Sequence, residues 1–169
     1  MLVHRFEGAV VLDAIHEHRP TFTVGAITAL NNIAAQPRAT KDDFASLRTV
    51  YSGGAPISAG VRDEIRARTG MDVHNIYGMT ETTSPTHAVP LGVSAPVDVA
   101  TGTLSIGVSV FNTRARIVDD DGAELPHGQI GELLVSGPQV ISSYWNKPER
   151  TAEKIVGGEL HTGDVGADG

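Results

Sequence analysis

A chain of 169 residues has the length of one ordinary domain, and 40% hydrophobic with 20% charged residues is the composition of a globular protein rather than a disordered or fibrous one. The net charge of −7 and the scattering of 13 basic residues argue against a nucleic-acid surface, which needs clustered Lys and Arg. Zero cysteines exclude disulfides and thiolate metal sites, and neither a membrane-length apolar run nor a signal-peptide pattern is present, so we expect a cytoplasmic protein without a transmembrane segment.

The first hundred residues alternate between helical and strand patterns. Apolar residues at helical spacing predict helices, and the short apolar runs between them predict strands. The expected elements are helices over residues 9–18, 27–35 and 59–69, and strands over residues 22–24, 47–51 and 73–77. Ser58 and Gly70 suit the N-cap and the left-handed C′ position of the third helix. This alternation implies a mostly parallel sheet with helices on both faces.

After about residue 100 the pattern changes to strand alternation and turn signals. Residues 114–118 and 130–136, with the Asp120-Asp121-Gly122 turn between them, predict an antiparallel hairpin or meander. Pro148 is suited to begin a helix through Ile155, which Gly157-Gly158 would end.

This change of pattern predicts that the chain has two structural parts. We expect an α/β part over residues 1–100 and a small, barrel-like β-rich subdomain over residues 101–169. Residues 91–103, rich in Gly, Pro, Ser and Val, would connect them.

The stretch from Tyr77 to Glu81 combines side chains suited to ATP and Mg²⁺. The Tyr77 ring can lie against adenine, and Gly78 lets the backbone approach a ligand without a Cβ. Thr80 offers a hydroxyl to a phosphate, and Glu81 offers hard oxygens to Mg²⁺. The alternative is a turn followed by a helix start, with Thr80 as the N-cap.

The segment Gly53-Gly54-Ala55-Pro56 follows a predicted strand and precedes a predicted helix. Ligands of parallel sheets gather beyond the carboxyl ends of the strands, and Tyr77-Gly78 also lies at such an end. We therefore expect the two segments to face one pocket, although a plain turn at Gly53 is the alternative.

Several other sites are disfavoured by spacing. His16 and His18 lie two apart on a helix and cannot chelate one metal. The run Asp119-Asp120-Asp121-Gly122 lacks the alternating spacing of a Ca²⁺ loop. No Gly-x-Ser-x-Gly elbow, Gly-x-Gly-x-x-Gly turn or Gly-Lys-Ser/Thr loop occurs, which disfavours serine hydrolases, dinucleotide folds and P-loop NTPases.

Five segments taken in order resemble the adenylate-forming superfamily, which includes acyl-CoA synthetases, aryl-CoA ligases, beetle luciferases and adenylation domains of peptide synthetases. They are Ser52-Gly53-Gly54-Ala55-Pro56, Tyr77-Gly78-Met79-Thr80-Glu81-Thr82-Thr83, residues 131–137, residues 144–149 and His161-Thr162-Gly163-Asp164. The resemblance covers the second half of the large N-terminal domain and ends before the hinge to a C-terminal lid. It implies that residues 131–137 and 144–149 are structural.

The resemblance also implies roles in nucleotide binding. The backbone of residues 53–56 would lie against adenine, Tyr77 would cover the other face, and Asn75 would place an amide near the adenine amino group. Asp164 would accept hydrogen bonds from both ribose hydroxyls. A polar residue on a solvated strand end is the alternative for Asn75, and an Asx-turn residue is the alternative for Asp164.

The reaction implied by the resemblance has two steps. A carboxylate and ATP, with Mg²⁺, form an acyl adenylate and pyrophosphate, and the thiol of CoA then displaces AMP. Thr80 and Glu81 would be this chain's catalytic share, and Gly78, Met79 and Pro85 would line the acyl pocket. Met79 stands where peptide-synthetase domains usually have proline, which favours an acyl-CoA synthetase acting on fatty acids.

Some family parts do not occur in the 169 residues. The phosphate-binding loop ending in Pro-Lys-Gly and the lid lysine are both absent, and Gly25-Ala26-Ile27 stands where many relatives have proline. We therefore expect a fragment of an acyl-CoA synthetase that is inactive by itself and exposes surfaces that favour self-association. The alternatives are a non-catalytic nucleotide-binding or structural module, or part of an adenylation domain or aryl-CoA ligase of the same superfamily.

Overall fold

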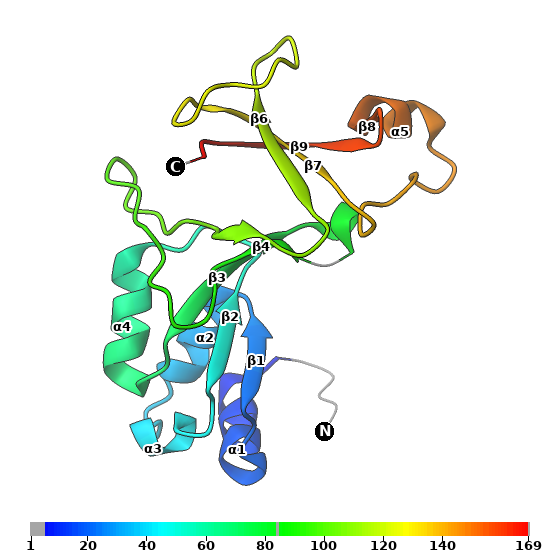
Figure 1. The fold of residues 1–169 in the computed structure, drawn as a ribbon. Helices are drawn as coiled ribbons and strands as arrows, with labels where there is room; N and C mark the ends of the chain where they lie inside the picture. Colours follow the sequence, from blue (N-terminus) through cyan, green and yellow to red (C-terminus); the bar gives the residue numbers. More distant parts are fainter. Residues whose placement is uncertain (1–5, 84, 169) are drawn as a thin grey trace. The chain divides into compact units, whose positions relative to one another are not determined.

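The structure, a computed structural model, describes residues 6–83 and 85–168 (Figure 1). The chain forms two compact units. The first runs up to Tyr77 and resumes over His87–Val108, and the second comprises Gly78–Thr86 and continues from Ser109. Tyr77 and its neighbour Gly78 thus belong to different units, although they are consecutive in the sequence.

The first unit contains the expected alternation of helices and strands. Its elements are α1 (Gly8–His18), β1 (Phe22–Gly25), α2 (Ile27–Ala34), α3 (Lys41–Phe44), β2 (Thr49–Ser52), α4 (Ala59–Thr69) and β3 (Val73–Gly78). Strands β1, β2 and β3 pair in parallel, which confirms the predicted parallel sheet. The strand order continues with β4 (Pro85–Ala88) and β5 (Val108–Ser109), which contain residues of both units.

Local sequence signals fix helix α4. The Ser58 hydroxyl accepts a hydrogen bond of 3.3 Å from the Val61 amide, which satisfies one of the unpaired donors of the first turn. Gly70 takes the left-handed conformation at the other end, with φ of 76°. Ile65 is fully buried. The bounds predicted for this helix are therefore correct at both ends.

The helices cover one face of the parallel strands, not two as expected. Residues of all four helices form one apolar cluster with Val50 and Val73. On β1 the alternate residues Phe22 and Val24 point to the other face, and each is 58% exposed. Further along that face, the Tyr51 hydroxyl donates a 2.9 Å hydrogen bond to the Val89 carbonyl, so a loop takes the place of a helix layer.

The second unit is built on an antiparallel sheet with strand order β6-β7-β9-β8. The strands are β6 (Arg114–Val118), β7 (Gly131–Ser136), β8 (Ile155–Val156) and β9 (Glu159–Gly166). The β6–β7 pairing confirms the predicted hairpin. Together the two units confirm the expected fold class, an α/β part with a partial parallel sheet followed by a β-rich part.

One prediction for the second unit is wrong in detail. Helix α5 (Pro148–Lys154) begins at its proline as expected but ends before Ile155. Gly157 and Gly158, with φ of 60° and 84°, form the turn between β8 and β9 instead of ending the helix. Consecutive residues with positive φ suit a tight hairpin turn, and glycine adopts them without steric cost.

Candidate functional site

The turn at Gly53 packs directly against strand β3. Ser52 pairs with Asn75 in the register of β2 and β3. A Cβ on Gly53 would lie 2.4 Å from the Ile76 carbonyl oxygen, which is too close for any side chain. Gly54 adopts a φ of 82°, in the region that favours glycine. The two glycines therefore bring a side-chain-free turn beside the segment that leads into Tyr77.

Tyr77 is half-buried at the end of β3. Its ring contacts the ring of His87 in an edge-to-face arrangement, with centroids 5.9 Å apart and planes inclined at 61°. Burial lowers the pKa of His87 below its usual value, so the imidazole is held in its neutral form. His87 was not singled out from the sequence, because nothing in its local pattern indicates that β4 brings it to Tyr77.

Asn75 is buried, with 3% of its surface exposed, which rules out the solvated strand end considered from the sequence. Its side-chain nitrogen donates to the carbonyls of Leu104 and Ser105 at 3.2 and 3.1 Å. These bonds fix the orientation of the amide, so its nitrogen is directed to the backbone of the first unit. The oxygen is then the atom of this side chain suited to accept a bond from a ligand.

Thr80 is exposed and begins a short 3₁₀ helix, η1 (Thr80–Thr82). The residue that caps this helix is Met79, so the alternative role of Thr80 as an N-cap is wrong. Thr82 braces the turn instead. Its buried hydroxyl accepts from the Met79 amide at 3.1 Å and donates to the Met79 carbonyl at 2.9 Å. Thr80 therefore presents its hydroxyl at the surface.

Glu81 is held at two points within the second unit. Its carbonyl accepts a 2.8 Å hydrogen bond from the Ile141 amide, and its Oε1 accepts a 2.7 Å bond from the Tyr144 hydroxyl. The Arg150 guanidinium lies 5.3 Å from the centre of the Tyr144 ring. Burial and the Glu81 carboxylate raise the pKa of Tyr144, so the phenol remains a donor. The sequence assigned Tyr144 a structural role and missed this contact.

The described residues contain no group of three His, Cys, Asp or Glu side chains that could hold a metal ion by themselves. At η1 the oxygen-bearing side chains are those of the exposed Thr80 and the half-buried Glu81, whose Oε1 is bonded to Tyr144. A single carboxylate fits Mg²⁺ that arrives with the phosphate oxygens of a nucleotide, because Mg²⁺ commonly takes one or two carboxylates together with phosphates and water. The chain's donor set thus suits a metal–nucleotide complex rather than a free ion.

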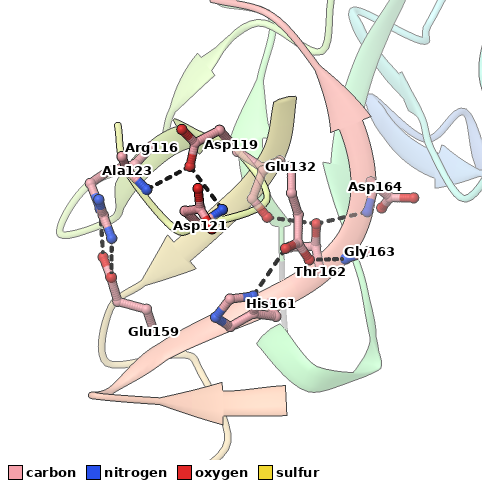
Figure 2. A network of polar contacts seen from close by, with 11 residues as sticks. Arg116, Asp119, Asp121, Ala123, Glu132, Glu159, His161, Thr162, Gly163 and Asp164 are labelled. Atoms are coloured by element: carbon pink, nitrogen blue, oxygen red, sulfur yellow. Dashed lines mark hydrogen bonds and ion pairs between the residues drawn. The ribbon is translucent and has the colours of Figure 1, made fainter. Parts of the chain in front are cut away.

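Asp164 lies on strand β9 and is exposed. Its amide donates a 3.0 Å hydrogen bond to the Thr162 hydroxyl, which in turn donates a 2.7 Å bond to the Leu133 carbonyl. Figure 2 shows the Asp164 carboxylate directed away from this polar network. The backbone of Asp164 is therefore held by its neighbours, and its carboxylate faces outward.

The remaining candidate residues lie along the same segment of the second unit. Gly78 ends β3, Met79 precedes η1, and Pro85 begins β4; all three are half-buried.

A cavity of about 280 Å³ is lined by other residues, from helices α1, α2 and α3 and strand β1 of the first unit. Leu30, Ile33 and Phe44 in its wall belong to the apolar core, and its lining includes no candidate site residue.

The candidate residues thus fall into two sets. Gly53, Gly54, Ala55, Pro56, Asn75 and Tyr77 belong to the first unit, and Gly78, Met79, Thr80, Glu81, Pro85 and Asp164 belong to the second. The first set combines exposed backbone with an aromatic ring and an oriented amide. The second combines the exposed Asp164 carboxylate, the half-buried Glu81 carboxylate and a hydroxyl. An aromatic ring and carboxylate oxygens are groups suited to a base and to a phosphate-bound Mg²⁺.

Comparison with known proteins agrees with this chemistry. The family model described as "AMP-binding enzyme" matches residues 2–145, and the chain belongs to this family. It is 39% identical over 160 residues to a feruloyl-CoA synthase of Amycolatopsis sp., covering 95% of this chain and 31% of that protein. It is also 39% identical over 145 residues to a long-chain-fatty-acid–CoA ligase of Escherichia coli O6:H1, covering 86% of this chain and 25% of that protein.

The fold is shared with a solved structure of ATP-bound MatB from Rhodopseudomonas palustris. The TM-score is 0.83 at 32% identity, and the match covers 98% of this chain and 32% of MatB. The chain therefore spans about a third or less of the proteins it matches. The resemblance to adenylate-forming enzymes is confirmed.

No helix within the described residues has the length and apolar character needed to span a membrane.

Proposed function

We propose that this chain supplies the adenine, ribose and Mg²⁺ contacts of an ATP-dependent ligase that joins a carboxylic acid to CoA. The observation that carries the proposal is the packing of Gly53 on the Ile76 carbonyl. It leaves a turn without side chains beside the half-buried Tyr77, in a chain that belongs to the AMP-binding family.

The adenine contacts come from the first unit. The backbone of Gly53, Gly54, Ala55 and Pro56 lies against one face of the base, and the Tyr77 ring stacks on the other. Base stacking on an aromatic side chain contributes about 1–3 kcal/mol. The oxygen of Asn75 accepts a hydrogen bond from the adenine amino group, because its nitrogen is already bonded to the Leu104 and Ser105 carbonyls.

The ribose and phosphate contacts come from the second unit. Asp164 accepts hydrogen bonds from both ribose hydroxyls, and Thr80 donates to a phosphate oxygen. Glu81, oriented by Tyr144, provides one oxygen ligand for Mg²⁺. A bound ion would supply charge neutralisation at the phosphates.

The reaction of the whole enzyme has two half-reactions. A carboxylate oxygen attacks the α-phosphorus of ATP, and the bond to pyrophosphate breaks. The CoA thiol, after losing its proton, attacks the acyl carbon and displaces AMP. Cationic groups for the phosphates lie outside the motifs found in the 169 residues, so we propose that this chain alone does not form acyl-CoA.

The acyl group we propose is a fatty acid, received along Gly78, Met79 and Pro85. Met79 and residues 144–149 support an acyl-CoA synthetase over a peptide-synthetase domain, and the similarity to a fatty-acid ligase supports the alkyl substrate. Burial of each methylene contributes about 0.8 kcal/mol, so the preference should rise with chain length until the pocket is filled. A hydroxycinnamic-type acid is the second candidate, favoured by the similarity to feruloyl-CoA synthase.

One experiment tests the proposed function. The full-length protein containing these residues is assayed for pyrophosphate release with fatty, aryl and amino acids, and the 169-residue chain is assayed beside it. We expect release with fatty acids by the full-length protein only, and CoA-thioester formation on adding CoA. Release with amino acids alone would contradict the assignment, and thioester formation by the 169-residue chain would contradict its proposed inactivity.

A further inference from the structure

Strand β9 carries a bulge at the residues around Asp164. In its pairing with β7, His161 lies opposite Leu134 and Val165 lies opposite Glu132. Three residues of β9, Thr162, Gly163 and Asp164, therefore stand against Leu133 alone. Such bulges redirect a side chain out of the regular strand alternation, and they leave the extra residues without ladder hydrogen bonds, so that other groups can bond them. Gly163 takes a φ of 77°, as the bulge requires.

The carboxylate of Glu132 supplies those bonds. One oxygen accepts a 2.9 Å hydrogen bond from the Gly163 amide, and the other lies 3.0 Å from Nδ1 of His161 (Figure 2). The Glu132 side chain thus bonds both His161, which precedes the bulge, and Gly163, which lies at its middle. Thr162 completes the arrangement, since its hydroxyl joins the Leu133 carbonyl to the Asp164 amide.

The charge of Glu132 suits this role. Burial raises the pKa of Glu132, but the bonds from His161 and Gly163 outweigh burial and lower the pKa below its usual value. The carboxylate is therefore ionised at neutral pH and accepts both bonds as a charged group, which makes them stronger than bonds to a neutral acceptor.

We propose that Glu132 is a positioning residue for Asp164: by bonding the Gly163 amide and His161, it holds the bulge in the shape that presents the Asp164 carboxylate to a ribose diol. This inference rests on the proposed role of Asp164 in nucleotide binding. Glu132 touches no ligand itself. It acts through the backbone of residues 161–164, and the requirement for two simultaneous bonds explains why a carboxylate stands there.

The test separates positioning from general stability. The variants are Glu132→Ala, which removes both acceptors, and Glu132→Gln, which retains one. Glu159→Gln is the matched control: Glu159 lies on β9, the strand that carries the bulge, and its side chain is 24% exposed against 29% for Glu132, but its partner is Arg116 on β6. Each protein is titrated with AMP and with 2′,3′-dideoxy-AMP, and amide exchange at Gly163 is followed by NMR.

In the wild-type chain we expect AMP to bind about tenfold or more tightly than the dideoxy compound, as for hydrogen bonds to a charged group. Glu132→Ala should bring this ratio close to one and accelerate Gly163 exchange. Glu132→Gln should restore part of the ratio, and Glu159→Gln should leave it unchanged.

Two outcomes would overturn the inference in different ways. If the wild-type chain discriminates between the two nucleotides and Glu132→Ala retains that ratio, Glu132 does not position Asp164 and the ribose role stands. If the wild-type chain binds both equally or neither, the ribose role itself fails and the inference falls with it. Unchanged Gly163 exchange in Glu132→Ala would contradict the structural step in either case.

Discussion

The phenol of Tyr144 donates a 2.7 Å hydrogen bond to the Oε1 atom of Glu81, and Arg150 lies over the same ring at 5.3 Å from its centre. The two residues come from sequence motifs that carry different expectations, one for metal binding and one for structure alone. Their contact means that the orientation of the proposed Mg²⁺ ligand depends on a side chain far along the chain.

Replacing Tyr144 with phenylalanine should weaken the Mg²⁺-dependent part of nucleotide binding. The substitution keeps the ring under Arg150 and removes only the donor to Glu81. We expect affinity for Mg²⁺–ATP to fall about three- to tenfold, which is a modest effect because the pair is partly exposed. Binding of AMP without Mg²⁺ should change little. Calorimetric titration with and without Mg²⁺ measures both.

The matched control is Tyr51→Phe, because the Tyr51 hydroxyl also donates one hydrogen bond, to the Val89 carbonyl in the first unit. An equal loss of Mg²⁺–ATP affinity in both variants would show that the effect of Tyr144→Phe is general destabilisation.

The neutral state of His87 predicts a pH-dependent stability. Burial lowers the pKa of His87 below the unfolded value of 6.5, so the unfolded chain binds a proton that the folded chain does not. The stabilising contribution is fully present above pH 6.5 and decreases as the pH falls from there towards the folded pKa. His87→Gln should reduce this decrease. Urea unfolding at pH 7.5 and 5.5 measures it.

His18→Gln serves as the control for that experiment, since His18 is exposed. An identical loss of stability between the two pH values in the wild type and in His87→Gln would mean that other groups cause the pH dependence.

Gly53→Ala should destabilise the protein and disturb its nucleotide contacts. The added Cβ would lie 2.4 Å from the Ile76 carbonyl oxygen, so the turn or the end of β3 must move. We expect a loss of about 1–3 kcal/mol in the free energy of unfolding, as for overpacked sites. Gly60→Ala is the comparison: it lies in α4 with nothing within 4 Å of its Cβ position, and should be neutral or stabilising. Equal stability of both variants would contradict the close packing at Gly53.

Strand β1 should promote self-association. It is the edge of the parallel sheet, and Phe22 and Val24 on its open face are each 58% exposed. Exposed strand edges with apolar side chains pair readily with other chains. We expect dimers or larger species by light scattering at high concentration, and a shift towards monomer on Val24→Lys. A monomeric wild type would show that this edge does not drive association.

The structural features that could be predicted from the sequence are those determined by residues close together in the chain. The ends of α4 follow from Ser58 and Gly70, and the strand after it follows from a short apolar run, so these were predicted correctly. Helix α3 is only four residues long, with too few positions to show a period, and it was missed. The prediction that helices cover both faces of the sheet was wrong, because the alternation of helices and strands along the chain does not specify the face on which each helix packs.

In the candidate site, too, local features were predicted and contacts between distant segments were not. The segments near Gly53 and Tyr77 were recognised from their own residues, and the Gly53–Ile76 contact confirms that they are neighbours. The contacts of Glu81 with Tyr144 and of Tyr77 with His87 were not predicted, because each joins segments whose proximity only the fold creates. The bulge at Thr162–Asp164 likewise depends on the register of two strands.

The most direct test of the account is calorimetric titration of the 169-residue chain with AMP, comparing the wild type with Tyr77→Ala and Asp164→Ala. If the chain carries the adenine and ribose contacts, the wild type should bind with a dissociation constant near the millimolar range. Each variant should weaken binding about tenfold or more, consistent with the loss of ring stacking or of bonds to a charged carboxylate. Absence of binding at millimolar AMP, or binding that neither substitution changes, would contradict the account.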